Sequence, residues 1–213
     1  MAGDDYYDSL IGSAYSAYME RPWLSRTVGR AVWGGDTRSY YESMGAIGEV
    51  PAGGTVVDCP CGAGPALRAA PVDGKIRYLA IDLSPSMLRR ARRRASERGL
   101  SGIEFVEADA KDLPIESGTV DLFVSYWGLH CYEDPAATLT EAARVLKPGG
   151  RLVGAALVSG RDHLRQRLLI RSDMGGFGTV GSGEEVERWL RETGFDPRLS
   201  SSGPMLFFDA AAD

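Results

Sequence analysis

Short apolar runs alternate with helical patterns between residues 55 and 159. The runs are compact and rich in Val, Ile and Leu, which is typical of strands buried on both faces of a parallel sheet. Because helical segments lie between them, the alternation predicts an α/β fold with helices on both faces. The predicted strands are Thr55–Cys59, Ile76–Asp82, Ile103–Asp109, Val120–Trp127 and Arg151–Ser159.

Capping residues locate the helices of this pattern. A polar N-cap side chain accepts a hydrogen bond from the first helical turn, and a glycine just past the last turn adopts the left-handed conformation that ends a helix. The predicted starts are Ser84 before Pro85, Asp134 before Pro135, and Ser182, which forms a capping box with Glu185. The predicted ends are Gly99, the run Leu146–Gly150 and Gly194, and a shorter helix is expected over Pro65–Ala70.

The two ends of the chain follow other patterns. Two apolar runs, Pro197–Ser201 and Met205–Asp209, flank a Ser-Gly-Pro turn and predict an antiparallel hairpin at the sheet edge. A tyrosine-rich segment with two or three helical patterns precedes Thr55. We expect a single domain over residues 1–213, with a helical cap (1–50), a core (51–159) and C-terminal helices and edge strands (160–213).

Composition excludes several classes of protein. The net charge is −5, so no general attraction to nucleic acid or to an anionic membrane is expected. The longest apolar runs, such as Leu152–Val158, are too short to cross a bilayer, and the acidic N-terminus does not resemble a signal peptide. Three cysteines without framework spacing are typical of a reducing compartment. We therefore expect a cytoplasmic protein without membrane insertion.

A glycine-rich turn follows the first strand, and an acidic residue ends the second. The turn runs from Cys59 to Gly64, and Asp82 closes the run Tyr78–Asp82. Such a turn lets backbone N–H groups approach a ligand, while a carboxylate at the tip of the second strand can accept hydrogen bonds from both ribose hydroxyls. The pair indicates a site for a nucleoside-containing cofactor.

Two residues distinguish between the cofactors that use such turns. Leu67 stands where a dinucleotide fingerprint requires Gly or Ala for close helix packing, which disfavours a dehydrogenase. Asp58, directly before the turn, would repel a pyrophosphate but suits a cationic amino-acid group. A cofactor with a positively charged amino-acid portion is therefore favoured over NAD or FAD.

An ordered set of motifs resembles the class I S-adenosylmethionine-dependent methyltransferases. The resemblance covers about Thr55 to Ser159 and is closest to the group that contains quinone-biosynthesis and many small-molecule methyltransferases. Pro60 departs from the pattern, because it replaces the first motif glycine and has no backbone N–H. The motifs are Asp58-x-Pro60-x-Gly62-x-Gly64, Leu79–Leu88, Glu107–Pro114, Asp121–Ser125 and Leu146–Leu152.

The resemblance implies a fold, a cofactor and its contacts. The fold is a three-layer Rossmann-like one, with a seven-stranded, mostly parallel sheet, an antiparallel last strand and an N-terminal helical cap. The cofactor is S-adenosylmethionine, and the product is S-adenosylhomocysteine. The implied cofactor-binding residues are Asp58, Pro60, Cys61, Gly62 and Gly64 near the methionine portion, Asp82 at the ribose, Leu83, Met87, Asp109 and Ala110 around the adenine, and Ser125 and Tyr126 beside the sulfonium.

The acceptor side is less determined by the sequence. His130 follows the fourth strand and is a candidate general base, but a structural residue packed on the next helix is the favoured interpretation. Tyr7, Tyr15 and Trp127 are candidates for contacts with the substrate or cap, or for filling the core of the cap. The strand ends in Ser125-Tyr126-Trp127 rather than Asn/Asp-Pro-Pro-Tyr, which argues against methylation of planar amide or adenine nitrogens.

The sequence therefore predicts methyl transfer to a small organic acceptor, with O- or C-methylation favoured. A quinone or lipid methyltransferase and a non-catalytic cofactor-binding relative remain as alternatives. The arginine run Arg89–Arg94 invites a nucleic-acid interpretation, but its helical spacing places apolar residues on one face and arginines on the solvated side. Cys59, Cys61 and Cys131 do not have zinc-site spacing, so no metal is expected. No oligomeric state is indicated.

Overall fold

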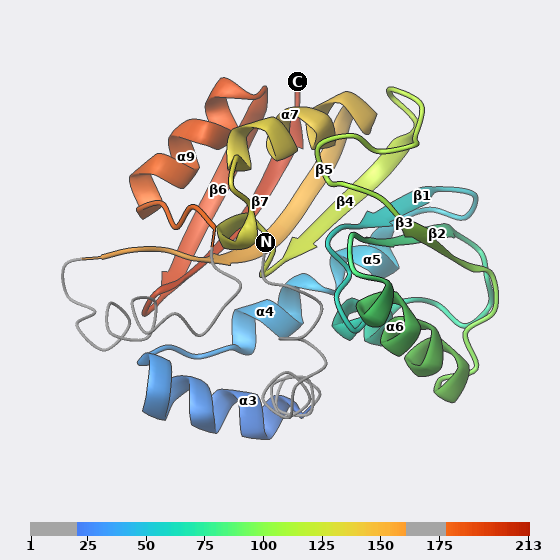
Figure 1. Cartoon of the computed structure of the whole chain (residues 1–213), viewed down its shortest axis with the longest axis horizontal. Coiled ribbons are helices and arrows are strands. Elements are labelled where there is room, and N and C mark those ends of the chain that lie inside the picture. Colours follow the sequence, from blue (N-terminus) through green and yellow to red (C-terminus); the bar gives the residue numbers. More distant parts are fainter. Residues whose placement is uncertain (1–20, 161–177) are drawn as a thin grey trace.

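A seven-stranded sheet forms the centre of the computed structural model, which describes residues 21–160 and 178–213 (Figure 1). The strand order is β3-β2-β1-β4-β5-β7-β6. Strands from β3 to β5 are parallel to their neighbours, and β7 is antiparallel to both β5 and β6. This confirms the predicted sheet. The strands are β1 Thr55–Asp58, β2 Arg77–Asp82, β3 Ile103–Glu107, β4 Val120–Tyr126, β5 Leu146–Leu157, β6 Phe195–Ser202 and β7 Met205–Ala212.

Helices cover both faces of this sheet. Buried residues of α4, α5, η2 and α6 pack on one face, and those of α7 and α9 pack on the other. Figure 1 shows α7 and α9 together on one side and α3, α4 and α5 on the opposite side. The helices are α3 Pro22–Val28, η1 Gly29–Trp33, α4 Arg38–Ser43, α5 Ala46–Glu49, η2 Pro65–Ala69, α6 Pro85–Glu97, η3 Leu129–Cys131, α7 Pro135–Val145 and α9 Gly183–Glu192.

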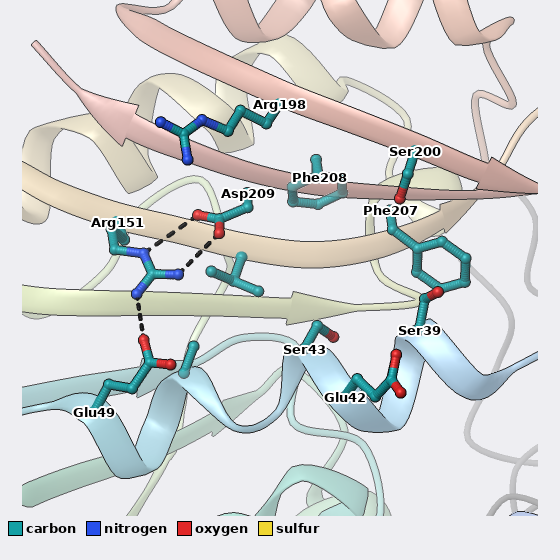
Figure 2. Close-up of a pocket in the computed structure, with 12 residues that line it drawn as sticks. Ser39, Glu42, Ser43, Glu49, Arg151, Arg198, Ser200, Phe207, Phe208 and Asp209 are labelled. Atoms are coloured by element: carbon teal, nitrogen blue, oxygen red, sulfur yellow. Dashed lines mark hydrogen bonds and ion pairs between the residues drawn. The ribbon is translucent and has the colours of Figure 1, made fainter.

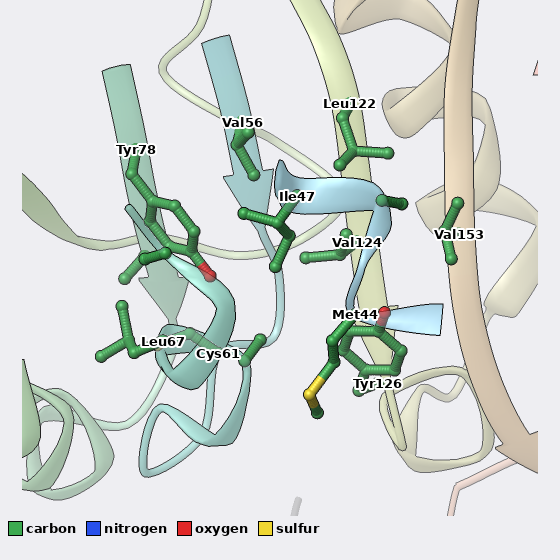
Figure 3. Close-up of a cluster of buried hydrophobic side chains, with 14 of the residues drawn as sticks. Met44, Ile47, Val56, Cys61, Leu67, Tyr78, Leu122, Val124, Tyr126 and Val153 are labelled. Carbon is green, nitrogen blue, oxygen red and sulfur yellow. The ribbon is translucent and has the colours of Figure 1, made fainter. Parts of the chain in front are cut away.

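The continuous apolar runs of the sequence reflect this double coverage. Successive side chains of a strand point to opposite faces, so a strand covered on both sides needs apolar residues at every position. Val56 and Val57 are both fully buried, in clusters on opposite faces. Figure 3 shows part of the first cluster, in which Ile47 from α5 lies near Val56 and Val124, and Met44, the residue after α4, lies near Tyr126.

The three predicted N-caps and the two predicted glycine ends are confirmed. Gly99 and Gly194 follow their helices with φ of +66° and +87°, in the left-handed region that glycine adopts without strain. Glu185 completes the capping box by accepting a hydrogen bond from Ser182 N at 2.8 Å. Each N-cap side chain accepts from its first turn: Ser84 from Met87 N (3.4 Å), Asp134 from Ala137 N (3.0 Å) and Ser182 from Glu185 N (3.2 Å).

Two element predictions need correction. The run Leu146–Gly150 does not end a helix but begins β5, because α7 stops at Val145 and Leu146 already pairs with Val120. Pro148 has no N–H to continue a helix, which is consistent with this boundary. The short helix after β1 is a 3-10 helix over Pro65–Ala69 rather than an α-helix over Pro65–Ala70.

The N-terminal helices are held onto the antiparallel side of the sheet by polar contacts. Asp36 N donates to Ser202 Oγ at 2.7 Å. Arg151 on β5 pairs with Glu49 at 2.7 Å and with Asp209 on β7 at 2.8 Å. These contacts link α4 and α5 to β5, β6 and β7. In the part of the chain that the structure describes, no helix is long and apolar enough to span a membrane.

Candidate cofactor and acceptor site

The glycine turn after β1 has a conformation that its sequence explains. Gly62 and Gly64 have φ of +51° and +76°, which L side chains rarely adopt. A Cβ at Gly62 would meet nothing within 4 Å, so open space lies beside this residue. A Cβ at Gly64 would lie 2.6 Å from Leu67 Cδ1, so this glycine allows the turn to pack on η2. Cys61 N donates to Ile81 O at 2.7 Å and joins the turn to β2.

Asp82 at the end of β2 connects the turn to the next helix. Its Oδ2 accepts a hydrogen bond from Gly62 N at 2.8 Å, and its Oδ1 accepts one from Ser84 N at 2.9 Å. The residue is 8% exposed. Each carboxylate oxygen can accept more than one hydrogen bond, so Asp82 can hold the turn and still accept from ribose hydroxyls.

Asp58 lies at the end of β1 and is 1% exposed. Tyr78 Oη donates a hydrogen bond to Asp58 Oδ2 at 2.9 Å. Burial raises the pKa of Asp58 to about 8, and the negative charge of Asp82 also raises it, while the Tyr78 hydrogen bond opposes the shift. The carboxyl group therefore holds its proton at neutral pH when no cation lies beside it.

An apolar surface lies next to Asp82 at the predicted adenine position. Leu83 is 51% exposed, which is unusual for a large apolar residue at a strand end, while Met87 is buried on the first turn of α6. Ala108 N donates to Asp82 O at 3.3 Å, so the segment that leads to Asp109 and Ala110 runs beside this surface. The structure thus brings the residues predicted for adenine binding to one edge of the sheet.

The turn after β4 contacts the turn after β1. A Cβ at Gly128 would clash with the Pro60 ring, so Pro60 packs directly on this second turn. Ser125 and Tyr126 are buried at the end of β4, and Tyr126 Oη accepts a hydrogen bond from Ser43 Oγ at 3.2 Å. Pro60 therefore has a packing role at the position where the family pattern has glycine.

Trp127 has two features that the sequence did not indicate. Its φ is +61°, a strained conformation for a bulky residue, although Trp127 N donates to Ala155 O at 2.8 Å. Its Nε1 is buried without a hydrogen-bond partner among the described residues. The indole ring lies 5.3 Å from the Tyr40 ring, measured between centroids. An unpaired buried donor in a strained residue at the end of β4 is a candidate ligand contact.

His130 is buried, 6% exposed, on the short helix η3. Its Nδ1 accepts a hydrogen bond from Leu157 N at 3.1 Å, and this bond assigns the proton of the neutral ring to Nε2. Burial lowers the pKa of His130 to about 4. A neutral imidazole whose Nδ1 already accepts a hydrogen bond is held by the fold, and in this arrangement its one basic nitrogen is occupied, so the general-base role, which stays a prediction, would require this hydrogen bond to break.

The remaining predicted residues fall in two groups. Tyr7 and Tyr15 lie outside the described residues. Cys59, Cys61 and Cys131 are thiols whose pKa burial raises, and Cys131 Sγ donates to Trp127 O at 3.3 Å. Across residues 21–160 and 178–213, no group of three or more His, Cys, Asp or Glu side chains is arranged to hold a metal ion.

A groove of about 270 Å³ lies between α4–α5 and strands β5, β7 and β6 (Figure 2). Figure 2 shows Arg151 between Glu49 and Asp209 in this groove. Ser43 lines it and also donates to Tyr126, so the groove adjoins the far side of the β4 end. None of the predicted cofactor residues lines it.

Comparisons with known proteins agree with this geometry. Residues 57–154 match the family model described as a methyltransferase domain. A ubiquinone/menaquinone biosynthesis C-methyltransferase from Brucella canis is 39% identical over 104 residues, which are 47% of this chain and 39% of that protein. The chain therefore spans about two fifths of the length of this curated relative.

Solved structures share the fold over most of the chain. An S-adenosylmethionine-dependent methyltransferase from Aquifex aeolicus has a TM-score of 0.65 and 24% identity, covering 93% of this chain and 96% of its own. Geranyl diphosphate C-methyltransferase from Streptomyces coelicolor A3(2), solved with Mg²⁺, geranyl diphosphate and S-adenosylhomocysteine, has a TM-score of 0.65 and 19% identity, covering 83% and 81%. At these identities the likeness concerns the fold.

The sheet, the glycine turn and the comparisons agree on one class: residues 57–154 match a methyltransferase domain, and the fold is shared with S-adenosylmethionine-dependent methyltransferase structures. Within that class, the relative from Brucella canis is of the quinone-biosynthesis type, in agreement with the motif resemblance. The residues present fit S-adenosylmethionine, the cofactor of the class. Open space lies beside Gly62, each carboxylate oxygen of Asp82 can accept more than one hydrogen bond, and Leu83 offers an exposed apolar surface.

Proposed function

We propose that the protein transfers a methyl group from S-adenosylmethionine to a small organic acceptor, with O- or C-methylation favoured, and releases S-adenosylhomocysteine. The observation that supports this most is the hydrogen bond that Gly62 N donates to Asp82 Oδ2 at 2.8 Å. Leu83, which is half exposed, follows Asp82 directly. A carboxylate, a backbone turn and an apolar surface at one sheet edge match the ribose, the amino-acid portion and the adenine of this cofactor.

The bound cofactor would supply a methyl group on a sulfonium centre, ready for in-line displacement. The protein's own contribution to such a reaction is alignment and exclusion of water. Asp82 would accept from the ribose hydroxyls, and Leu83 and Met87 would cover the adenine. The remaining proposed contacts are Asp109 and Ala110 at the adenine edge, Asp58, Pro60, Cys61, Gly62 and Gly64 along the methionine portion, and Ser125 and Tyr126 near the sulfonium.

We place the acceptor at the end of β4. The buried Nε1 of Trp127 has no hydrogen-bond partner among the described residues, and it could donate a hydrogen bond to an oxygen of the methyl acceptor. The Tyr40, Tyr126 and Trp127 rings meet there, with the Tyr40 centroid 5.2 Å from that of Tyr126. Aromatic faces also favour a nearby sulfonium cation. A base is needed there only if the acceptor must lose a proton, and His130 is the candidate for that role.

A quinone or lipid acceptor is the second candidate. It is supported by the curated relative from Brucella canis, whose name is ubiquinone/menaquinone biosynthesis C-methyltransferase. The aromatic rings of Tyr40, Tyr126 and Trp127 at the end of β4 also support it. We further propose that residues 1–213 work as a single cytoplasmic methyltransferase domain. A nucleic-acid substrate is disfavoured by the net charge of −5.

Methyl-labelled S-adenosylmethionine, incubated with the purified full chain and a cell extract, would test the proposal. Label in the small-molecule fraction would support the first candidate, and label in the lipid fraction the second. Label in protein or nucleic acid would refute both acceptor classes. An Asp82→Ala variant is the matched control and should transfer little label, since it lacks the ribose contact. Cofactor binding without any transfer would favour the non-catalytic alternative.

A further inference from the structure

Asp58 belongs to the first motif and forms a hydrogen-bonded pair with Tyr78, which lies outside every motif. Both residues are 1% exposed, and Tyr78 Oη donates to Asp58 Oδ2 at 2.9 Å. The pair comes from neighbouring parallel strands, in which Val56 is the register partner of Tyr78 and Asp58 follows two residues later on the same face. The tyrosine therefore reaches along the sheet to hold one oxygen of the carboxyl group.

The surroundings of this carboxyl group are apolar or acidic. Asp82 on β2 is the nearby charged group, and its negative charge opposes ionisation of Asp58. The thiols of Cys59 and Cys61 and the hydroxyl of Tyr126 also lie close enough to feel the charge of Asp58. The buried cluster on this face of the sheet also contains Met44, the residue after α4, and Ile47 from α5 (Figure 3). Among the described residues, none that carries a positive charge is paired with Asp58.

A buried carboxyl group with a raised pKa is expected to ionise when a cation binds beside it. Burial raises the pKa of Asp58 to about 8, so the group is mostly protonated at neutral pH in the free protein. An ammonium group beside it would form an ion pair of low solvent exposure and lower this pKa again. The Tyr78 hydrogen bond favours the ionised form and leaves the second carboxyl oxygen for the incoming cation.

We propose that Tyr78 is a positioning residue that orients the Asp58 carboxyl group toward the ammonium group of the cofactor, and that cofactor binding therefore releases a proton. This rests on the proposed function. In the binding step the carboxyl O–H bond breaks, its proton passes to solvent, and an ammonium–carboxylate pair forms. Tyr78 Oη donates to Oδ2 throughout.

Proton release can be measured by calorimetry of the full chain in buffers of different ionisation enthalpy. At about pH 6.5 an α-amino group is charged and Asp58 is protonated, so we expect about one proton released per bound S-adenosylmethionine. S-adenosylhomocysteine keeps the ammonium group without the sulfonium charge and should release the same number. Asp58→Asn should bind more weakly and release no proton.

Tyr78→Phe tests the positioning role. It removes the hydroxyl group and keeps the ring, so we expect about ten-fold weaker cofactor binding at pH 6.5, with the loss of affinity shrinking as the pH rises and Asp58 ionises without help. Tyr41→Phe is the matched control, because its half-buried hydroxyl bonds to Ser25 rather than to Asp58. This control should leave both affinity and proton release unchanged.

The outcomes separate this proposal from the proposed function. If neither cofactor form binds, the proposed function fails. If both bind but no proton is released, or if Tyr78→Phe behaves like Tyr41→Phe at every pH, the positioning role of Tyr78 is refuted while the methyltransferase function stands. Proton release with S-adenosylmethionine alone would assign the partner of Asp58 to the sulfonium and overturn the ammonium contact.

Discussion

Replacing Asp58 by Asn should change how the stability of the cofactor-free protein depends on pH. Burial raises the pKa of Asp58 from 3.8 to about 8 in the folded protein, whereas the unfolded chain has the ordinary value. Between these values the folded state holds a proton that the unfolded state has lost. This stabilisation is fully present below the unfolded pKa and is lost as the pH rises toward the folded pKa.

The size of the effect follows from the two pKa values. One proton of difference lowers the free energy of unfolding by about 1.4 kcal/mol per pH unit. From about pH 5.5 to about pH 7.5, the Asp58 contribution should fall by about 2.5 kcal/mol, since the slope flattens near the folded pKa. Asn has no such proton, so Asp58→Asn should gain stability relative to the wild type by this amount over the same interval.

Urea unfolding followed by tryptophan fluorescence, at a series of pH values without cofactor, would measure this difference. Asp109→Asn is the matched control, because it changes an exposed carboxylate at the same sheet edge. The gain of Asp58→Asn is compared with the curve of this control. A curve for Asp58→Asn that runs parallel to that of the wild type would refute the reasoning, because it would show that Asp58 has the same pKa in the folded and unfolded states.

Three further variants test the site. Leu83→Ala should weaken S-adenosylmethionine binding about five-fold in a calorimetric titration without changing urea unfolding, because the side chain is half exposed until a ligand covers it. Gly64→Ala should lower the free energy of unfolding by about 2 kcal/mol, since the residue has φ of +76° and its Cβ would approach Leu67. His130→Asn keeps an acceptor for Leu157 N, so label transfer should stay within about ten-fold of the wild type; a larger loss with unchanged urea unfolding would favour the base role.

The sequence predicted the sheet and most helix boundaries because these depend on local signals. An N-cap such as Ser84 and a left-handed glycine such as Gly99 act within one turn of chain, and the structure shows both. The boundary at Leu146 was wrong because it depends on pairing with Val120 on another strand, which a local pattern does not reveal. Local sequence signals therefore predicted which helices and strands form, while pairing between distant strands determined where one of them begins.

The partners of the predicted site residues could not be read from the sequence. Asp58 was predicted as a cofactor-binding residue. The Tyr78 hydroxyl that donates to it was not predicted, because Tyr78 stands in a strand of mostly buried residues and nothing in the local sequence marks it as polar in function. His130 was a candidate base, but the hydrogen bond that its Nδ1 accepts comes from Leu157, 27 residues away. The positive φ of Trp127 could not be predicted from its residue type, because glycine or asparagine is expected at a position with such a backbone conformation.

The cofactor side and the acceptor side differ in how they are encoded. Asp58 and Asp82 end the adjacent parallel strands β1 and β2, and Gly62 lies in the turn that follows β1, so the spacing within one strand–turn–helix–strand unit is enough to bring them together. The proposed acceptor side combines Tyr126 at the end of β4 with Ser43 on α4, 83 residues apart, and depends on how α4 packs on the sheet. We therefore expect substitutions in α4 to alter the proposed acceptor surface without disturbing any cofactor motif. This is why the motifs identify the cofactor class while leaving the acceptor to be found by experiment.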